Sequence, residues 1–365
     1  MASAPPTLNR EHIRPGDRTC AAVSGGADSV AMLLMLHAAN ALPRNALGVG
    51  LSAVHVHHGL RDEEADADLA FVKALCLRLE VPLHIHHASV PERIVRAREA
   101  GKPETIEEAA RNLRYDFFSS LIAQGHADSI LTAHTLDDQA ETVLMKLLRG
   151  AWTEGLSGIH PVVVVPSGPR PGKILRPLLS VRRAELVDFL RSHDQPWRTD
   201  SSNADEAFTR NRIRHHLLPI LREYNPSLDQ ALANLAELAR DDEARWQVEL
   251  SRILPQILLP GKPVRGGGRA VSTAPGDSGS VAIEIERLRG FDLALRRRVV
   301  RGAARSLGAR LSFDDTNRLL ALAGLASAPT VSARPGAILH LSGGLRVERS
   351  ARELRLHRSE EPKDT

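Results

Sequence analysis

Residues 19–29 read Thr-Cys-Ala-Ala-Val-Ser-Gly-Gly-Ala-Asp-Ser, and this stretch decides the fold of the chain. A short apolar run leads into two glycines, an aspartate and two serines, and an apolar helix is expected to begin near Val30. The small residues leave backbone N–H groups uncovered, and the positive end of the helix dipole faces the same point. The stretch therefore predicts a cradle for a polyphosphate. The Gly-Lys-Ser/Thr ending of a Walker loop is missing here, so we do not expect machinery for the γ-phosphate.

Up to about residue 149, short apolar runs alternate with longer amphipathic ones. The pattern predicts strands near 19–23, 48–57, 82–87 and 129–133, and helices near 28–39, 63–79, 106–123 and 137–148. Such alternation indicates an α/β fold, a doubly wound parallel sheet covered on both faces. In these sheets ligands bind beyond the carboxyl ends of the strands, where Ser24, His57 and His134 are expected.

The remainder of the chain is less regular. Short proline-bounded apolar runs at 161–166 and 173–178 precede expected helices at 181–192 and from about 210 onward. We expect four segments: an α/β catalytic domain over 1–218, a helical region over 219–254, a flexible Gly/Pro/Ser-rich insertion over 255–280 and a small basic α+β domain over 281–365. In the last segment the pattern predicts an arginine-rich helix over 285–307, a helix over 314–323 and a hairpin of 337–341 with 345–347.

Composition narrows the class of protein. The chain has 365 residues, a formal charge of +4 and a pI near 9.4, which leaves room for a polyanionic partner. Its two cysteines, Cys20 and Cys76, form no Cys-x-x-Cys pair, which argues against structural zinc, an iron–sulfur cluster and disulfides. The start of the chain shows no secretory signal, and the longest apolar run, 30–36, is too short to span a bilayer. We therefore expect a soluble cytoplasmic protein.

The stretch 131–142 places three carboxylates at the start of a predicted helix. Thr135 can cap that helix together with Asp138, and capping alone is the simpler interpretation. However, Asp137, Asp138 and Glu141 gather on one side of the first turns, where their mutual repulsion requires a neutralising cation. Magnesium on ATP or a cationic substrate meets that requirement, so we predict a functional site here.

Histidines end the second predicted strand at His55, His57 and His58, and more follow at 84–87. A zinc site is one interpretation. Neighbouring residues of a strand point to opposite faces, however, and no cysteine pair or Glu-x-x-His spacing accompanies them. We favour His57 as a neighbour of an ATP phosphate.

Two further strings carry arginines at helical spacing. Arg111 and Arg114 share one side of a predicted helix, where they could grip phosphate or carboxylate groups. The string at 210–214 offers side chains suited to phosphate contacts with RNA, namely Arg210, Asn211, Arg212 and Arg214. A solvated helix face is the alternative for both strings.

The loop at 24–29 resembles the pyrophosphate-binding loop of the N-type ATP pyrophosphatases, which cleave ATP between the α and β phosphates. Five strings, in this order, resemble those of the bacterial tRNA(Ile)-lysidine synthetases over roughly residues 19–219. They read Ser-Gly-Gly-Ala-Asp-Ser at 24–29, His-His-Gly-Leu-Arg at 57–61, Ala-Arg-Asn-Leu-Arg-Tyr at 110–115, Thr-Ala-His-Thr-Leu-Asp-Asp-Gln-Ala-Glu-Thr at 132–142 and Arg-Asn-Arg-Ile-Arg at 210–214. The resemblance implies an adenine nucleotide alpha hydrolase-like fold for the first domain.

The same resemblance implies a reaction and its partners. ATP, with Mg²⁺, adenylates O2 of the wobble cytidine in the CAU anticodon of an isoleucine tRNA. The side-chain amine of L-lysine then displaces AMP at ring carbon C2 and forms lysidine. The implied partners are tRNA(Ile) with the CAU anticodon and L-lysine, without a membrane, and a homodimer stays open.

The resemblance also implies roles for individual residues. Pyrophosphate and nucleotide would be held by Ser24, Gly25, Gly26, Ala27, Asp28, Ser29, His57, Arg114 and His134. The catalytic set would be Asp28, Arg111, Asp137, Asp138 and Glu141, with magnesium on Asp28 and Asp137. The cluster from 137 to 141 would hold magnesium or the lysine ammonium, and the carboxylate that takes the proton is open. Residues 287–310 hold eight arginines against one aspartate, so tRNA contacts are expected from Arg210, Asn211, Arg212, Arg214, Arg296 and Arg297.

Three alternatives accompany this interpretation. A tRNA thiolase of the same pyrophosphatase group would adenylate a base but deliver sulfur through paired cysteines, which Cys20 and Cys76 do not supply. A GMP-synthetase-like enzyme would require a glutaminase partner. A catalytically idle RNA-binding protein would show erosion of Ser24, Asp28 or the carboxylate cluster, and none is eroded.

Overall fold

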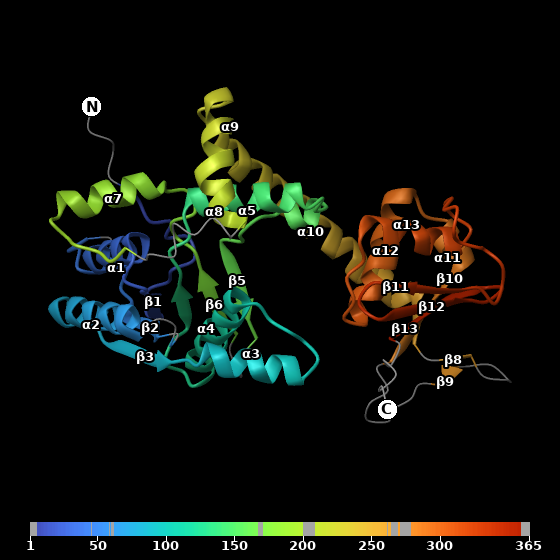
Figure 1. Cartoon of the computed structure of the whole chain (residues 1–365), viewed down its shortest axis with the longest axis horizontal. Coiled ribbons are helices and arrows are strands. Elements are labelled where there is room, and N and C mark those ends of the chain that lie inside the picture. The colour runs from blue at the N-terminus through green and yellow to red at the C-terminus, as the bar shows by residue number, and fades with distance from the viewer. Residues whose placement is uncertain are drawn as a thin grey trace. The chain divides into compact units, whose positions relative to one another are not determined.

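The computed structural model describes residues 6–44, 46–57, 59, 62–166, 171–199, 209–260, 262–263, 269–270 and 279–358. Residues 58, 60 and 61 of the predicted His-His-Gly-Leu-Arg string therefore lie outside the described residues. The chain divides into two compact units, Met1–Asp241 and Asp242–Thr365, and the division falls within the long helix α10 (Leu228–Ile257). Both units appear in Figure 1. No helix among the described residues is both long enough and apolar enough to cross a membrane.

The first unit is built on a sheet whose strand order is β3-β2-β1-β4-β6-β5. The strands are β1 (Arg18–Ala22), β2 (Gly50–His57), β3 (Leu83–His87), β4 (Ser129–Leu131), β5 (Val162–Val165) and β6 (Gly172–Leu175). All neighbours pair in parallel except β5, which is antiparallel to β6. Only residues 166–171 connect these two strands, too few for a parallel crossover. The predicted parallel-dominated α/β sheet is confirmed, with an antiparallel edge.

Alternate residues of the strands enter different cores on the two faces of the sheet. One face receives Ala21, Ala53, Leu131 and Leu175, which pack with helices α1 (Ala27–Asn40), α2 (Asp62–Arg78) and α7 (Arg183–Ser192). The other face receives Cys20, Val54, Ile130 and Ile174, which pack with Phe118 and Leu121 of α4 (Ile106–Ala123). The predicted coverage of both faces is thus observed.

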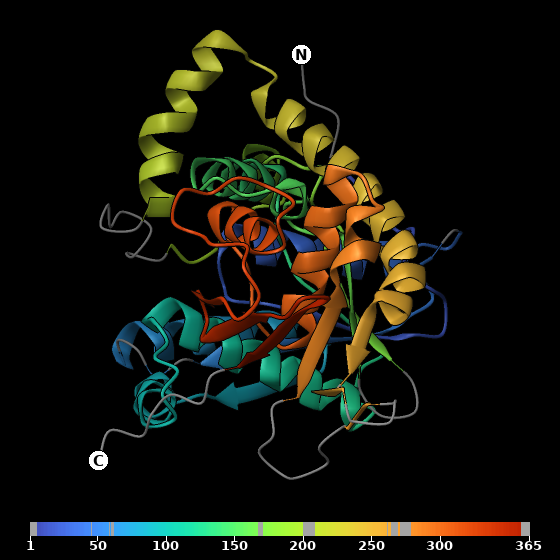
Figure 2. The ribbon, with the colours of Figure 1, turned by 90° about the vertical axis from the view of Figure 1, so that its right-hand side faces the viewer.

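Several helices complete this unit. The sequence pattern did not predict α3 (Val90–Glu99), which Ser89 caps and which packs against α4. Helix α5 (Leu136–Leu148) and the short α6 (Thr153–Leu156) follow β4. Further along, α8 (Thr209–Arg212), the π-helical turn η2 (Ile213–Leu217) and α9 (Leu218–Tyr224) form one continuous helical stretch. Figure 2 shows this stretch and α10 as the two arms of a helical hairpin.

The second unit holds an antiparallel sheet in the order β11-β12-β13-β10-β7. Its strands are β7 (Leu258–Pro260), β10 (Ser280–Glu284), β11 (Ile338–Leu341), β12 (Leu345–Arg349) and β13 (Glu353–Arg358), and the short pair β8 (Lys262–Pro263) and β9 (Arg269–Ala270) lies apart from them. The predicted hairpin at 337–347 is confirmed as β11 and β12. Residues 255–260, expected in a flexible insertion, instead complete α10 and form β7, because β7 pairs with β10.

The predicted arginine-rich helix over 285–307 is wrong as a single element. It is divided into α11 (Ile285–Arg289) and α12 (Leu293–Ser306). The division arises because the Asp292 side chain accepts a hydrogen bond from the Leu295 N–H at 2.9 Å and so starts a new helix. Helix α13 (Phe313–Leu322) matches its prediction, and all three helices pack on the sheet through a shared apolar core.

Candidate active site

The loop at 24–29 follows β1 directly and is closed by its own serines. The Ser29 hydroxyl lies 3.2 Å from both the backbone N and the Oγ of Ser24, and it donates to the Gly26 carbonyl at 2.9 Å. Gly26 is the N-cap residue of α1, and no side chain caps this helix start. Gly25 has φ +100°, which favours glycine. With Ala27, these residues present an open helix N-terminus at the end of the strand, the geometry of an anion site.

The carboxylates predicted at the start of α5 lie at the neighbouring strand end. Thr135 and Asp138 form the predicted capping box: the Asp138 Oδ2 accepts from the Thr135 N–H at 2.9 Å, and the Thr135 Oγ1 accepts from the Asp138 N–H at 3.4 Å. The other oxygen, Oδ1, accepts from arginines instead. Asp138 therefore serves both as a cap and as part of a charged cluster.

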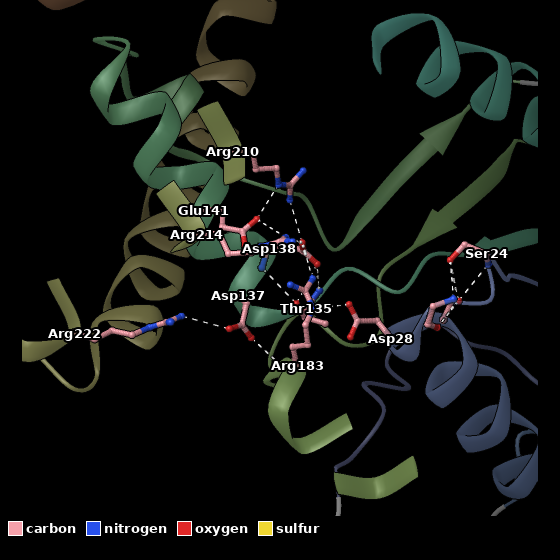
Figure 3. Close-up of polar contacts among 12 residues, drawn as sticks. Ser24, Asp28, Thr135, Asp137, Asp138, Glu141, Arg183, Arg210, Arg214 and Arg222 are labelled. Carbon is pink, nitrogen blue, oxygen red and sulfur yellow. Dashed lines mark hydrogen bonds and ion pairs between the residues drawn. The ribbon is translucent and has the colours of Figure 1, made fainter. Parts of the chain in front are cut away.

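Arginines from three later elements neutralise this cluster (Figure 3). Arg214 binds both oxygens of Glu141, at 2.6 and 3.0 Å, and Arg210 binds the same carboxylate at 2.8 Å and Asp138 at 3.0 Å. Arg210 and Arg214 lie four residues apart, across the junction of α8 with η2, so both reach the fully buried Glu141. Arg183, at the first position of α7, adds a third contact to Asp138 at 3.2 Å.

Asp137 is held by a second arrangement. Its Oδ2 accepts from the backbone N–H of Arg183 at 2.8 Å, and its Oδ1 lies 3.3 Å from the Arg222 guanidinium. Arg222 also binds both oxygens of the buried Asp229, at 2.8 and 3.0 Å, and Arg182 binds Asp229 at 2.9 Å. Asp137 is thus tied to α7 and to the helical hairpin.

Arg183 joins the two halves of the site. Its Nε donates to the Asp28 Oδ2 at 2.8 Å, while its Nη2 reaches Asp138 (Figure 3). The Asp28 Oδ1 is buried and has no hydrogen-bond partner among the described residues. Burial raises the pKa of Asp28, and this effect exceeds the opposing effect of Arg183. An orphaned, buried carboxylate oxygen at the start of α1 fits a cation that arrives with the phosphates.

Magnesium would find only part of its coordination shell in the protein. Among the described residues no three His, Cys, Asp or Glu side chains converge as a metal site. This fits a magnesium ion that keeps waters and phosphate oxygens and takes one or two carboxylates from the protein. Asp28, with its free oxygen, is the carboxylate best placed to contribute.

His134, predicted near the nucleotide, is a half-buried imidazole that follows β4. Its Nδ1 lies 3.0 Å from the Thr132 hydroxyl. Burial lowers the pKa of His134 to about 3, and the positive charges of Arg176, Arg114 and Arg210 act in the same direction. Burial also lowers the pKa of Arg114, and no described carboxylate is ion-paired with it. These effects outweigh the opposing charge of Asp138 and favour the neutral form of His134, while Arg114 supplies a positive charge near it.

Arg111 lies in the second turn of α4, and His57 lies at the end of β2. Arg111 is exposed, stacks 4.9 Å from the centre of the Tyr115 ring and lies 3.5 Å from its hydroxyl. Tyr115 also accepts from the buried Arg176 at 3.1 Å. His57 ends β2 and lies 3.2 Å from Asp66 of α2.

The predicted RNA contacts are only partly at the surface. Asn211 is buried, whereas Arg212 is exposed. Arg210 and Arg214 are ion-paired with the α5 carboxylates, so in this structure they neutralise acids, and their predicted contacts with tRNA stay a prediction. In the second unit, Arg296 donates to the carbonyls of Leu288 and Arg289 at the end of α11, and Arg297 stacks 5.2 Å from the Phe313 ring. These two arginines have partners within the fold, and their contacts with tRNA stay a prediction.

The helix that carries the carboxylates is fixed from the side by Gln139. Its Oε1 accepts from the Ile159 N–H at 2.6 Å, and the side chain is buried. Gly158 has φ +63°, and a Cβ there would lie 2.7 Å from the same oxygen. A close backbone approach therefore sets the position of α5.

Comparison with known proteins assigns the family. Residues 6–221 match the PP-loop domain family, which is more than half of the chain. A tRNA(Ile)-lysidine synthase from Solibacter usitatus is 39% identical over 93% of this chain and 67% of its own length. A tRNA(Ile)-lysidine synthase from Nitratidesulfovibrio vulgaris is 35% identical over 84% of each chain. The chain belongs to the tRNA(Ile)-lysidine synthase family. The predicted resemblance is confirmed.

A solved structure outside the lysidine synthase family shares the fold. The U34-tRNA thiolase NcsA from Methanococcus maripaludis, with its [4Fe-4S] cluster, aligns with a TM-score of 0.50 and 18% identity. The alignment covers 64% of this chain and 76% of that one. At this identity the likeness concerns the fold alone.

Two residues of the site were missed by the sequence analysis of this lysidine synthase family member. Arg183 and Arg222 each belong to surface-type helical patterns, and their partners Asp28 and Asp137 lie 155 and 85 residues away in the chain. Arg183 carried one weak signal, because it follows the carboxyl end of β6, where ligands of such sheets bind.

Proposed function

We propose that this chain ligates L-lysine to C2 of the wobble cytidine in tRNA(Ile) with a CAU anticodon. ATP first transfers its adenylyl group to the cytidine O2 and releases pyrophosphate. The lysine amine then attacks C2, AMP leaves, and lysidine is formed. The observation that carries the proposal is Arg183, which binds Asp28 of the phosphate loop and Asp138 of the carboxylate cluster and so places both half-sites together.

The loop at 24–29 forms the ATP half. The uncapped start of α1 would hold the pyrophosphate, and Ser24 and Ser29 would donate hydrogen bonds once their mutual contact opens. Magnesium, bound through the free Oδ1 of Asp28, would neutralise the leaving group. Arg114, which no described carboxylate neutralises, would offset the charge on the α-phosphate, and exposed Arg111 would assist.

The carboxylates of α5 form the lysine half. A free lysine amine has a pKa of about 10.4, so it arrives protonated and needs acidic partners. Asp137 and Asp138 each accept contacts from guanidinium groups that a lysine ammonium would replace. One of these carboxylates, or Glu141, would then accept the proton that nucleophilic attack releases.

The thiolase alternative loses support in the structure. Cys20 in β1 and Cys76 in α2 are both buried, and they face the cores on opposite sides of the sheet. Burial raises the pKa of Cys20 to about 12 and that of Cys76 to about 11, so both thiols stay protonated. Such cysteines supply neither the thiolates of an iron–sulfur cluster nor a sulfur carrier.

Mass spectrometry of the anticodon nucleosides tests the function directly. The protein is incubated with ATP, lysine and the CAU-anticodon tRNA(Ile), with methionine tRNA of the same anticodon as control. Lysidine in the first tRNA alone is expected. Thiocytidine, no modified base, or equal modification of both tRNAs would refute the proposal. We also propose that the protein is cytoplasmic. A homodimer stays a prediction, and light scattering tests it.

Asp28→Asn tests the ATP half. ATP turnover should fall by about 100-fold, because magnesium loses a ligand. The melting temperature should not fall at neutral pH. The pKa of Asp28 is raised in the folded state, so its ionised form destabilises the fold above that pKa, and asparagine removes this effect. A melting temperature several degrees lower would show that Asp28 is a structural ion-pair partner instead.

A further inference from the structure

The segment just before residue 200 contacts the phosphate loop at a point that the proposed function does not use. The backbone N–H of Arg198 donates to the Gly25 carbonyl at 2.9 Å, and Gly26 and Arg198 form an isolated parallel bridge. The adjacent Trp197 packs against the apolar core beneath α1. A segment more than 170 residues away in sequence thus holds the loop backbone.

Gly25 is the residue at which the loop needs such support. Its φ of +100° is one that few other residues adopt, and the Arg198 Cγ would lie 3.4 Å from a Cβ at this position, with Phe71 at 3.7 Å. Because glycine has wide conformational freedom, the peptide between Gly25 and Gly26 is easily rotated. Rotation would turn a carbonyl oxygen toward the phosphates in place of an N–H. The hydrogen bond from Arg198 opposes this rotation.

The side chain of Arg198 is held by α2. Its Nε donates to the Asp68 Oδ1 at 2.8 Å, and both side chains are partly exposed. Two residues earlier on the same helix, Asp66 lies 3.2 Å from His57. Helix α2 therefore contacts both the segment that supports the loop and the histidine predicted beside the nucleotide.

We propose that Arg198 is a positioning residue for ATP: its backbone N–H keeps the Gly25 carbonyl out of the phosphate cradle, and Asp68 keeps Arg198 in place. The inference rests on the proposed function only in that the loop binds ATP. It concerns nucleotide affinity, and it assigns no contact between Arg198 and substrate. Lysine binding, which involves the α5 carboxylates, should be insensitive to it.

The test measures affinity for a non-hydrolysable ATP analogue by calorimetry, without tRNA or lysine. Arg198→Pro removes the donor and should raise the Kd about tenfold. Arg198→Ala keeps the N–H but loses Asp68, so it should raise the Kd about threefold, as should Asp68→Asn. The double variant should be no worse than either single one, and Arg198→Lys should recover most of the affinity. Arg191→Ala, which removes an exposed pair with Asp188, is the matched control.

Kinetics supply the second measurement. For Arg198→Ala, the KM for ATP should rise while the KM for lysine and the kcat at saturating ATP stay within about twofold. An unchanged Kd in Arg198→Pro, or equal rises of both KM values in Arg198→Ala, would overturn the proposal. If Arg198→Pro does not fold, unchanged affinity in both Arg198→Ala and Asp68→Asn overturns it. Wild-type protein that binds the analogue but forms no lysidine would refute the proposed function and leave this inference standing.

Discussion

The arginines around α5 contrast with several arginines of the second unit in the partners that they bind. Around α5, guanidinium groups meet carboxylates: Arg210 and Arg214 bind Glu141, and Arg222 binds Asp137. In the second unit many meet backbone carbonyls. Arg296 binds the Leu288 carbonyl, and Arg301 binds that of Leu311 at 2.6 Å. The second unit also contains arginine–carboxylate pairs, such as Arg298 with Glu243, so the role of each arginine depends on its own partner.

The partners of the arginines, rather than their number, indicate what they do. A carboxylate that is paired with an arginine can exchange that partner for another cation, so such a pair is compatible with a substrate site. A carbonyl at the end of a helix needs a hydrogen-bond donor for the fold itself. Of the eight arginines between 287 and 310, Arg296 and Arg301 thus serve carbonyls of the fold itself.

Glu141→Gln should have the largest effect. Glu141 belongs to the carboxylates that could exchange an arginine partner for a substrate cation. Glu141 is fully buried and binds two arginines. The substitution removes the buried negative charge that neutralises both arginines, which should lower the free energy of unfolding by about 3–5 kcal/mol. Lysidine formation should fall at least about 100-fold. Urea unfolding and nucleoside mass spectrometry measure the two effects.

Glu223→Gln, on the exposed side of α9, is the control and should change stability by less than about 0.5 kcal/mol. If folded Glu141→Gln protein forms lysidine at a near-normal rate, Glu141 only neutralises arginines and takes no part in the reaction.

Glu243→Gln tests an arginine–carboxylate pair that serves the fold of the second unit. Glu243 binds the guanidinium of Arg298 at 2.8 and 3.0 Å, and that guanidinium also stacks 4.4 Å from the Trp246 ring. Breaking this buried pair should destabilise the second unit by about 3–5 kcal/mol. ATP-analogue affinity should not change. Hydrogen exchange of α12 gives the first quantity and calorimetry the second, with exposed Asp242→Asn as control. A loss of nucleotide affinity would show that this pair in the second unit also affects ATP binding.

Acid should act on the first unit through His134. Its pKa is about 3 in the folded protein, against an ordinary 6.5, so the unfolded chain binds the additional proton between these values. The free energy of unfolding should therefore decrease as the pH falls below about 6.5, by about 2 kcal/mol at pH 5. His134→Gln should remove this part of the dependence. Thermal unfolding of the wild-type and His134→Gln proteins from pH 7.5 to pH 5 tests this prediction. Parallel curves of stability against pH would contradict it.

The smallest effect compares two single arginines. Arg212→Ala, at an exposed position beside the carboxylate cluster, should weaken tRNA binding about threefold and reduce the slope of log K against log salt by about one. Arg296→Ala should leave that slope unchanged and lower stability by about 1 kcal/mol, since its donors serve carbonyls of α11. The opposite pattern would restore Arg296 as an RNA contact.

Features that depend on neighbouring residues could be predicted from the sequence. The loop at 24–29 and the cap formed by Thr135 and Asp138 both arise within a few residues, and both were found where expected. The capping signal at Asp292 was equally local, but the density of arginines around it suggested one long helix. Strand β13 also shows alternation in its sequence, Glu-Leu-Arg-Leu-His-Arg, and was not predicted.

Features that depend on tertiary contacts could not be predicted. Nothing near Arg183 in the sequence indicates that it faces Asp28, and nothing near Arg198 indicates Gly25. Such pairs require the sheet order and the path of the chain after β6. The carboxylate cluster was recognised as needing cations, but their origin in the protein itself was missed.

The close approach of Gly158 to Gln139 has a consequence for mutational tolerance. Any side chain at position 158 must displace a buried amide that fixes α5, and with it Asp137, Asp138 and Glu141. In a saturation library selected for growth, position 158 should therefore be as intolerant as the acidic residues themselves, although it carries no reactive group. Intolerance at this glycine would show that close packing, rather than a reactive group, limits which residues this position accepts.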